Sequence, residues 1–223
     1  MKEIAPDVWQ LGGGFPPNAI NMFVIGDVLI DAATRHAGRR IFRELDGREI
    51  NVHALTHVHP DHQGASHEVC ERLGVPYWVP EGDVDAAERP ELIGQRQPDH
   101  PVAQFFARTM SGPAHPVDRA LKEGDEVAGF TVLEVPGHSR GHIAYWRESD
   151  GVLILGDVLN NMDVITGIPG LREPKKFLTP DPVENRRSAK RLGELEPKIV
   201  LFGHGAPLRD GRKMTEFTRA LPD

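Results

Sequence analysis

The sequence predicts an α+β fold in which β-sheets pack face to face and helices cover their outer sides. Apolar runs typical of strands come in groups, with helical segments between the groups, and this grouping favours packed sheet layers. The order of strands followed by a helix occurs twice, changing near residue 116, without a detectable sequence repeat. The 223 residues, 39% of them hydrophobic, can bury a substantial core as one domain over 1–223.

The first part of the chain is predicted to begin with strands and to continue with helices between further strands. Pro, Gly and Asn turns separate three apolar runs that we expect to be strands, "DVWQLGG", "AINMFVIG" and "DVLIDAA". A helix is expected from Arg35 to about Leu45, followed by a strand in "VHALT". "GASHEVCERLG" predicts a helix that ends at Gly74, and "PYWVP" predicts a short strand.

Residues from about 80 to 115 differ in composition from the segments around them. They are rich in Pro, acidic and turn residues, with one apolar patch, "VAQFFARTM". This composition is typical of a surface insertion, and we expect a lid-like segment here.

Strand patterns return after this segment. "FTVLEVPG", "HIAYWRE" and "GVLILGD" predict strands, and "DPVENRRSAKRLGELE" predicts a helix with Asp181 as its N-cap. The strand "KIVLFG" and a last helix from about Gly211 complete the expected order.

Composition narrows the classes of partner. The net charge is −7 and the pI about 5.9, which argues against binding to nucleic acid or an anionic membrane surface, because phosphates require clustered Lys and Arg. Cys70 is the only cysteine, so neither an internal disulfide nor a thiolate metal cluster can form. No apolar stretch approaches the ~18 residues of a spanning helix. We expect a cytoplasmic protein with a small-molecule substrate, and a homodimer is left open.

The segment "THVHPDH", residues 56 to 62, concentrates side chains that bind metals. His57 and His59 are two apart in an extended or irregular segment, so both side chains can reach one cation. Asp61 and His62 are adjacent and must diverge, which favours a neighbouring cation. Pro60 stiffens the turn between the two pairs.

Further ligand types follow apolar runs that end in glycine. His138 lies in "EVPGHSRGH", Asp157 in "LILGDVL" and His204 in "VLFGHGAPL". The glycines permit close backbone approach and unusual dihedral angles beside these side chains. Imidazole and carboxylate groups together bind zinc and similar cations, so the pattern predicts a metal site.

The ordered motifs "HVHPDH", "PGHSRGH", "LGD" and "FGHG" resemble the motif series of the metallo-β-lactamase superfamily. The resemblance covers nearly the whole chain, including the "LIDA" turn at Asp31. It implies a four-layer αβ/βα sandwich with a two-metal site at one edge of the sheets. Position by position it implies ligands of the first metal (His57, His59, His138), ligands of the second (Asp61, His62, His204) and a bridging carboxylate (Asp157).

The chemistry implied by the resemblance is hydrolysis. Two cations about 3.5–4 Å apart can lower the pKa of a shared water and supply hydroxide, and a metal can stabilise the oxyanion that forms. Asp61 is the catalytic candidate, because it could also accept a proton from the nucleophilic water. We expect two divalent ions, zinc first, with iron or manganese as alternatives, and a small ester, thioester or lactone as substrate.

Other activities within the family remain open. The chain looks glyoxalase II-like or lactonase-like, but "QGAS" follows "HPDH" and no C-terminal basic extension is visible. A mononuclear iron dioxygenase acting on a persulfide would share His57, His59, His138 and Asp157. A β-lactamase is less favoured because no export signal is visible, and a non-catalytic metal-binding protein is the remaining alternative.

Residues near the motifs have further predicted roles. His142 competes with His138 as a ligand, and His138 is preferred because it lies at the glycine-flanked break. His53 is expected to be structural. Asp31 is either a turn residue or a group that orients a ligand imidazole. Substrate contacts are expected from four residues: Arg140, Asn160, Met162 and Phe105.

Overall fold

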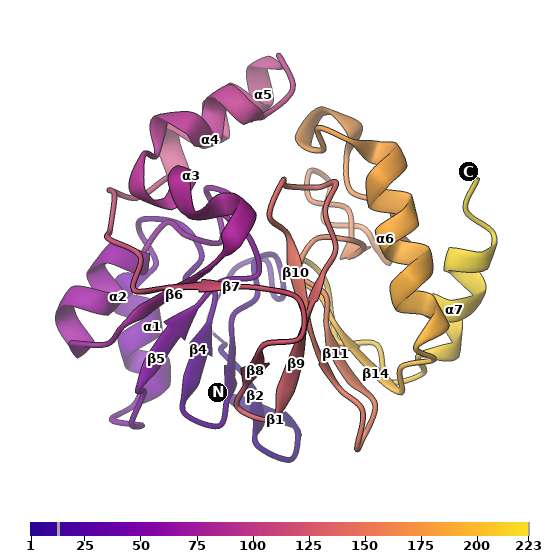
Figure 1. Ribbon diagram of the computed structural model, residues 1–223, viewed down its shortest axis with the longest axis horizontal. Coiled ribbons are helices and arrows are strands. Elements are labelled where there is room, and N and C mark those ends of the chain that lie inside the picture. The colour runs from indigo at the N-terminus through magenta and orange to yellow at the C-terminus, as the bar shows by residue number, and fades with distance from the viewer. Residues whose placement is uncertain (13, 223) are drawn as a thin grey trace.

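Two β-sheets lie face to face, and helices cover the outer side of each (Figure 1). The computed structural model describes residues 1–12 and 14–222. Within these residues the first sheet has the strand order β1 (Lys2–Ala5), β2 (Val8–Gln10), β3 (Phe23–Ile25), β4 (Val28–Ile30), β5 (Val52–Ala54), β6 (Tyr77–Pro80) and β7 (Arg119–Leu121). The second has the order β14 (Ile199–Leu201), β11 (Val152–Ile154), β10 (Ile143–Arg147), β9 (Phe130–Glu134) and β8 (Glu126–Val127).

Each sheet is buried on both faces, which explains its continuous apolar runs. Alternate side chains of a strand point to opposite faces. In β4, Val28 and Ile30 enter the core between the sheets, whereas Leu29 packs outward. Leu153 of β11 likewise packs outward, away from its neighbours Val152 and Ile154.

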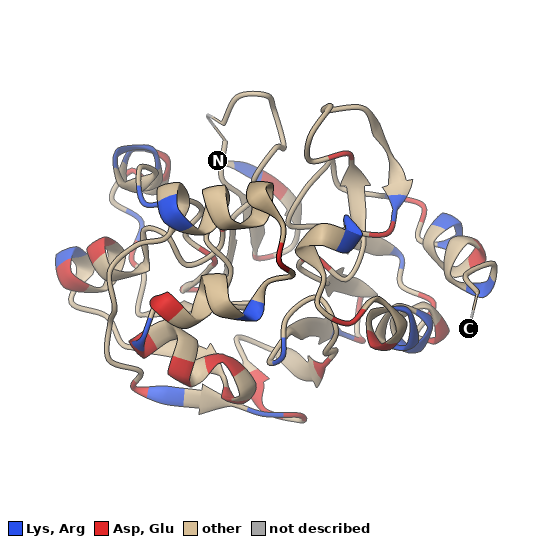
Figure 2. Ribbon diagram, turned by 90° about the horizontal axis from the view of Figure 1, so that it is seen from above, with Lys and Arg blue, Asp and Glu red and all other residues tan. Residues whose placement is uncertain are grey.

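Two helices cover each outer face. Helices α1 (Gly38–Leu45) and α2 (Ser66–Leu73) lie on one side of the molecule, and α6 (Pro182–Glu194) and α7 (Arg212–Arg219) on the other (Figure 1). Their solvent-facing sides carry acidic and basic residues interspersed (Figure 2). The layer order is helix, sheet, sheet, helix, so the predicted αβ/βα sandwich is confirmed.

Most predicted elements are found with boundaries shifted by a few residues. The helix expected from Arg35 begins at Gly38 and ends at Leu45. The helix ending at Gly74 is confirmed, with Gly74 at a positive φ of 66°, a conformation that glycine adopts without strain. Asp181 is the N-cap of α6 and accepts a hydrogen bond from Glu184 N at 2.9 Å. The short strands β1, β7, β8, β12 (Asn160–Met162) and β13 (Pro169–Arg172) were not predicted.

The segment from 80 to 115, predicted as a lid-like surface insertion, is largely helical. It contains the 3₁₀ turn η1 (Glu81–Asp83) and the helices α3 (Val84–Glu88), α4 (Glu91–Arg96) and α5 (Pro101–Met110). Ala86, Ala87 and Ile93 are buried against Leu55 and Val79. The first part of the segment therefore packs on the body of the protein. The lid-like role of the segment stays a prediction.

The strand directions bring several loops to one edge of the sandwich. β4 and β5 are parallel, and so are β11 and β14. β9 also runs in the direction of β11, because both are antiparallel to β10. The Asn21 side chain joins the sheets at this edge, where its amide nitrogen donates to Phe202 O and Gly205 O, both at 2.8 Å.

Candidate metal centre

Four of the predicted ligands lie in the loop that leaves the carboxyl end of β5. The loop turns tightly because the backbone N–H groups of His62 and Gln63 both donate to His59 O, at 3.1 and 3.0 Å. His57, His59 and His62 are buried, whereas the Asp61 side chain keeps 24% of its surface exposed. This turn places four ligand-type side chains within six residues.

The other three predicted ligands come from loops of the second sheet. His138 follows β9, Asp157 follows β11 and His204 follows β14, and all three are buried. Gly203 allows the last two loops to meet, because a Cβ at that position would overlap Asp157 Oδ1. The glycine beside His204 is therefore required by the packing of the centre.

The seven side chains converge in space. Three groups each bring their ligand atoms within 4.8 Å of one another: His57, His59 and His138; His57, His62 and Asp157; Asp61, His62 and His204. Asp157 Oδ2 lies 3.5 Å from His138 Nε2, 3.5 Å from His62 Nε2 and 2.9 Å from His204 Nε2. The carboxylate of Asp157 thus stands between two sets of imidazoles.

Hydrogen bonds at the far side of four rings determine which nitrogen faces the centre. Thr56 Oγ1 donates its proton to Asp31, and Thr179 Oγ1 donates to Lys175 O. Both hydroxyls must therefore accept from the rings beside them, His57 Nδ1 at 3.0 Å and His138 Nδ1 at 3.1 Å. The Nδ1 atoms of His62 and His204 donate to Asp31 Oδ2 and Ala19 O. Each of these four rings therefore turns its Nε2 atom inward.

Several inward-facing atoms lack a protein partner. Within the described residues, His57 Nε2, His62 Nε2 and Asp157 Oδ1 are buried without a hydrogen bond. A buried polar atom without a partner costs about 1–3 kcal/mol. Imidazole nitrogens and carboxylate oxygens are the ligands that zinc and similar cations take, so the residues fit bound cations.

The charges of the cluster also favour cations. Burial lowers the pKa values of His57 and His138, which keeps both rings neutral. Burial also acts against a charged His204, but Asp157 and Asp61 outweigh it and raise its pKa to about 10. The carboxylates thus draw positive charge toward the centre, and metal ions compete with protons for such atoms.

Comparison with known proteins identifies the family. The family model described as "Metallo-beta-lactamase superfamily" matches residues 15–204. The chain belongs to the metallo-β-lactamase superfamily.

Two curated relatives and one solved structure illustrate the likeness. The "Probable metallo-hydrolase YflN" of Bacillus subtilis (strain 168) is 29% identical over 200 residues, which are 81% of this chain and 76% of that protein. The "Hydroxyacylglutathione hydrolase" of Bdellovibrio bacteriovorus is 35% identical over 152 residues, 66% of this chain but only 46% of the relative. The structure of "TTHA1623 in a di-iron-bound form" has a TM-score of 0.61, 27% identity and 92% coverage of both chains. The chain is a metal-dependent hydrolase of this superfamily.

Two buried aspartates outside the ligand set hold the loops of this superfamily member in place. Asp31 accepts from Thr56 N at 2.8 Å and from His62 Nδ1 at 2.8 Å. It therefore orients an imidazole and also forms the turn after β4, with a φ of 61°. Asp83 accepts from Val58 N, Ser139 Oγ and Gly141 N, and so ties the loop of His57 and His59 to the loop of His138. No sequence motif pointed to Asp83.

Gln97, at the end of α4, was also missed. Its side-chain amide lies 2.5 Å from His59 Nε2, while its Oε1 is buried without a partner within the described residues. If His59 binds a metal through Nδ1, its Nε2 must carry the proton and donate. The amide oxygen of Gln97 then faces the ring, which satisfies both groups.

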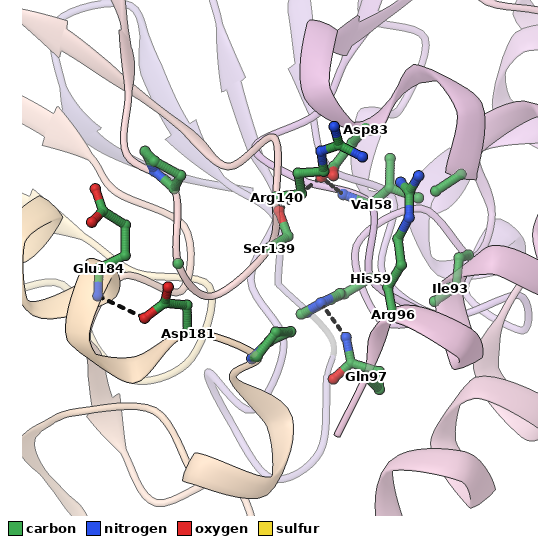
Figure 3. Close-up of a pocket in the computed structure, with 14 residues that line it drawn as sticks. Val58, His59, Asp83, Ile93, Arg96, Gln97, Ser139, Arg140, Asp181 and Glu184 are labelled. Carbon is green, nitrogen blue, oxygen red and sulfur yellow. Dashed lines mark hydrogen bonds between the residues drawn. The ribbon is translucent and has the colours of Figure 1, made fainter. Parts of the chain in front are cut away.

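Two cavities border the centre. One, of about 150 Å³, is lined by His138, Asp157 and His204, by Asp61, and by Phe106 and Met110 of α5. The other, of about 390 Å³, has Arg96 and Arg140 on its wall, with Asp181 and Glu184 across from Arg96 (Figure 3). His59 and Gln97 line both cavities, so this pair stands at their boundary.

Two of the four predicted substrate contacts line these cavities, and two do not. Asn160 lines the smaller cavity and Arg140 the larger. Met162 is buried in β12 and lines neither cavity, and Phe105 is 59% exposed on the outside of α5. Its neighbour Phe106 faces the centre instead, because adjacent helix residues point about 100° apart.

The remaining histidines near the site have other partners. His142 Nε2 accepts from Asp157 N at 3.0 Å and its ring stacks on His57, so it supports the ligands from behind. His53 is buried and bonds to Leu29 O and Ser66 Oγ, as expected for a structural residue.

No described helix is long and apolar enough to span a membrane.

Proposed function

We propose that this superfamily member is a dinuclear hydrolase that cleaves a small ester, thioester or lactone. The observation that carries the proposal is the position of Asp157 between two complete sets of ligands. The first set is His57, His59 and His138, and the second is Asp61, His62 and His204. The solved relative in a di-iron-bound form supports a pair of metals.

The cations would lower the pKa of water and polarise the substrate carbonyl when bound; zinc is the first candidate, with iron or manganese as alternatives. The protein's own residues orient the ligands and accept the proton that hydrolysis releases. Asp61 is suited to accept a proton because its side chain is 24% exposed and lines the smaller cavity, whereas Asp157 is only 5% exposed. Thr56, Asp31 and Thr179 hold the imidazoles in the orientation that ligation needs.

The smaller cavity sets limits on the substrate. About 150 Å³ next to the ligands holds only a small acyl group or ring. Ala103, Phe106 and Met110 give it an apolar wall, and Asn160 and Lys175 supply polar groups. A compact substrate with one polar substituent fits this lining. The name of the hydroxyacylglutathione hydrolase relative supports including thioesters.

The test combines metal quantification with a substrate panel on the same batch of purified protein. We expect two metal ions per chain and turnover of at least one ester, thioester or lactone. His138→Ala should abolish turnover, because it removes a ligand of the first metal, and should leave the circular dichroism spectrum unchanged. His36→Gln, at an exposed histidine, is the matched control and should retain activity.

Three outcomes would contradict the proposal. Activity retained by His138→Ala would show that the assigned site is wrong. One iron per chain together with oxygen consumption on a persulfide would favour a mononuclear dioxygenase. A fully loaded protein that hydrolyses nothing on the panel would favour a metal-binding role.

A further inference from the structure

A second group of metal-binding side chains lies outside the centre, where α2 faces the segment that leads from α5 to β7. His67 and Glu71 are one helical turn apart on α2, and His115 belongs to the returning segment. Their ligand atoms lie within 4.8 Å of one another, and the group shares no residue with the three groups of the centre.

The spacing of the two imidazoles matches a coordinated cation. His67 Nδ1 and His115 Nδ1 face each other at 3.2 Å. Two nitrogens bound to zinc at roughly 2.0–2.1 Å with tetrahedral angles lie about 3.4 Å apart. Glu71 Oε1 is 3.9 Å from His115 Nδ1, and its side chain is 65% exposed, so a small rotation brings the carboxylate to the third corner.

The surroundings of His115 hold its ring in place, because its side chain is only 13% exposed. The edge of the ring packs on Tyr77, with centroids 5.7 Å apart. Without a cation, the facing nitrogens can share only one proton in a single N–H···N bond.

We propose that His67, Glu71 and His115 bind a divalent cation of the zinc type, with solvent at the fourth position. Such a site has a structural role, because it cross-links α2 to the chain that leaves α5. Met110 O, at the end of α5, already accepts from Arg35 N at 2.9 Å. The cation adds a second anchor five residues later, and so holds the helix that supplies Phe106 and Met110 to the smaller cavity.

The experiment compares zinc binding by the full-length protein and paired variants that leave the centre intact. His115→Gln removes one ligand, and His36→Gln replaces an exposed histidine elsewhere. Glu71→Gln removes the carboxylate, and Glu68→Gln replaces another exposed glutamate on the same helix. Each protein is titrated with zinc against a chromogenic chelator, and bound zinc is counted by mass spectrometry.

We expect wild type, His36→Gln and Glu68→Gln to bind the same amount of zinc, and His115→Gln to bind about one ion fewer per chain. Glu71→Gln should lower the affinity for this ion at least tenfold without affecting the binding of the others. Zinc should also slow hydrogen exchange of residues 111–118 in wild type but not in His115→Gln. Equal zinc binding by His115→Gln and His36→Gln, both folded by circular dichroism, would overturn the proposal and leave an imidazole–imidazole hydrogen bond.

Discussion

Asp31 shows how much of the centre depends on a residue that contacts no metal. It receives hydrogen bonds from Thr56 N, Thr56 Oγ1 and His62 Nδ1. Because the hydroxyl proton of Thr56 goes to Asp31, Thr56 cannot donate to His57 and accepts from its Nδ1 instead. One carboxylate thus determines the tautomer of two imidazoles.

We therefore predict that Asp31→Asn weakens metal binding. Asparagine tolerates the positive φ of this position, but its NH₂ group cannot accept a hydrogen bond. Loss of such a supporting carboxylate costs about 10–100-fold in metal affinity, which chelator competition can measure. Asp27→Asn, at an exposed aspartate that bonds to Asn51, is the control, and equal affinities of the two variants would contradict this role.

Asp163 makes the stability of the loop beside the smaller cavity depend on pH. Its carboxylate accepts from Lys175 Nζ at 2.5 Å and from Thr166 N at 3.0 Å. The Lys175 contact, followed by the Thr166 bond, lowers the pKa of Asp163. A carboxyl group whose pKa is lower in the folded state than in the unfolded state stabilises the fold fully above the ordinary pKa near 4. This stabilisation is lost as the pH falls through the pKa of the folded state.

We predict that Asp163→Asn destabilises the protein most at neutral pH. Urea unfolding at a series of pH values should show the difference from wild type shrinking below about pH 4. A difference that stays constant from pH 7 to below pH 4 would show that the charge of Asp163 contributes nothing.

At the scale of elements, α4 and α5 were the least predictable part of the molecule. Their sequence is interrupted by Pro and Gly, and each helix is short, with bounds Glu91–Arg96 and Pro101–Met110. They are stabilised by packing on the body through residues such as Ile93 and Ala103, which local patterns do not reveal. The ligand motifs were predictable because each is compact in sequence and follows a buried strand.

The supporting contacts could not be predicted for a related reason. Asp83 meets Ser139, and Gln97 meets His59, across long separations in sequence. Each is a single polar residue without a local motif. Only the folded arrangement of η1, α4 and the ligand loops shows what these side chains do.

We predict that Gln97→Leu weakens the first metal and that Gln97→Glu does not. Leucine removes the acceptor for His59 Nε2–H, whereas glutamate keeps an oxygen at the same reach. Metal affinity should fall about tenfold or more in Gln97→Leu, as measured by chelator competition. Gln95→Leu, at another residue of α4, is the control. Equal metal affinities of Gln97→Leu and wild type would show that Gln97 does not support the centre.

For the whole molecule, the centre joins two sheets that meet chiefly through apolar packing. Its predicted ligands come from loops of both sheets, so bound cations would link the two halves of the sandwich. Ligands that bind only the folded state stabilise it by mass action, by about 2.7 kcal/mol at a hundredfold excess over Kd.

We predict that removing metal with a chelator lowers the melting temperature and that added zinc restores it. The increase should continue with zinc concentration above saturation, as linkage requires. Calorimetry with and without chelator measures the shift. His57→Ala should reduce it strongly, whereas an undiminished shift in that variant would place the stabilising ion elsewhere.

The bonds from Asn21 to Phe202 and Gly205 connect segments at opposite ends of the sequence. On a ribosome, His57 and His59 emerge before His204 by an interval of roughly 10 s at ordinary rates of translation. During that time the ligand set of the centre is incomplete. We therefore expect the centre to be loaded after the fold is complete, with ions that surround the finished protein and not the nascent chain.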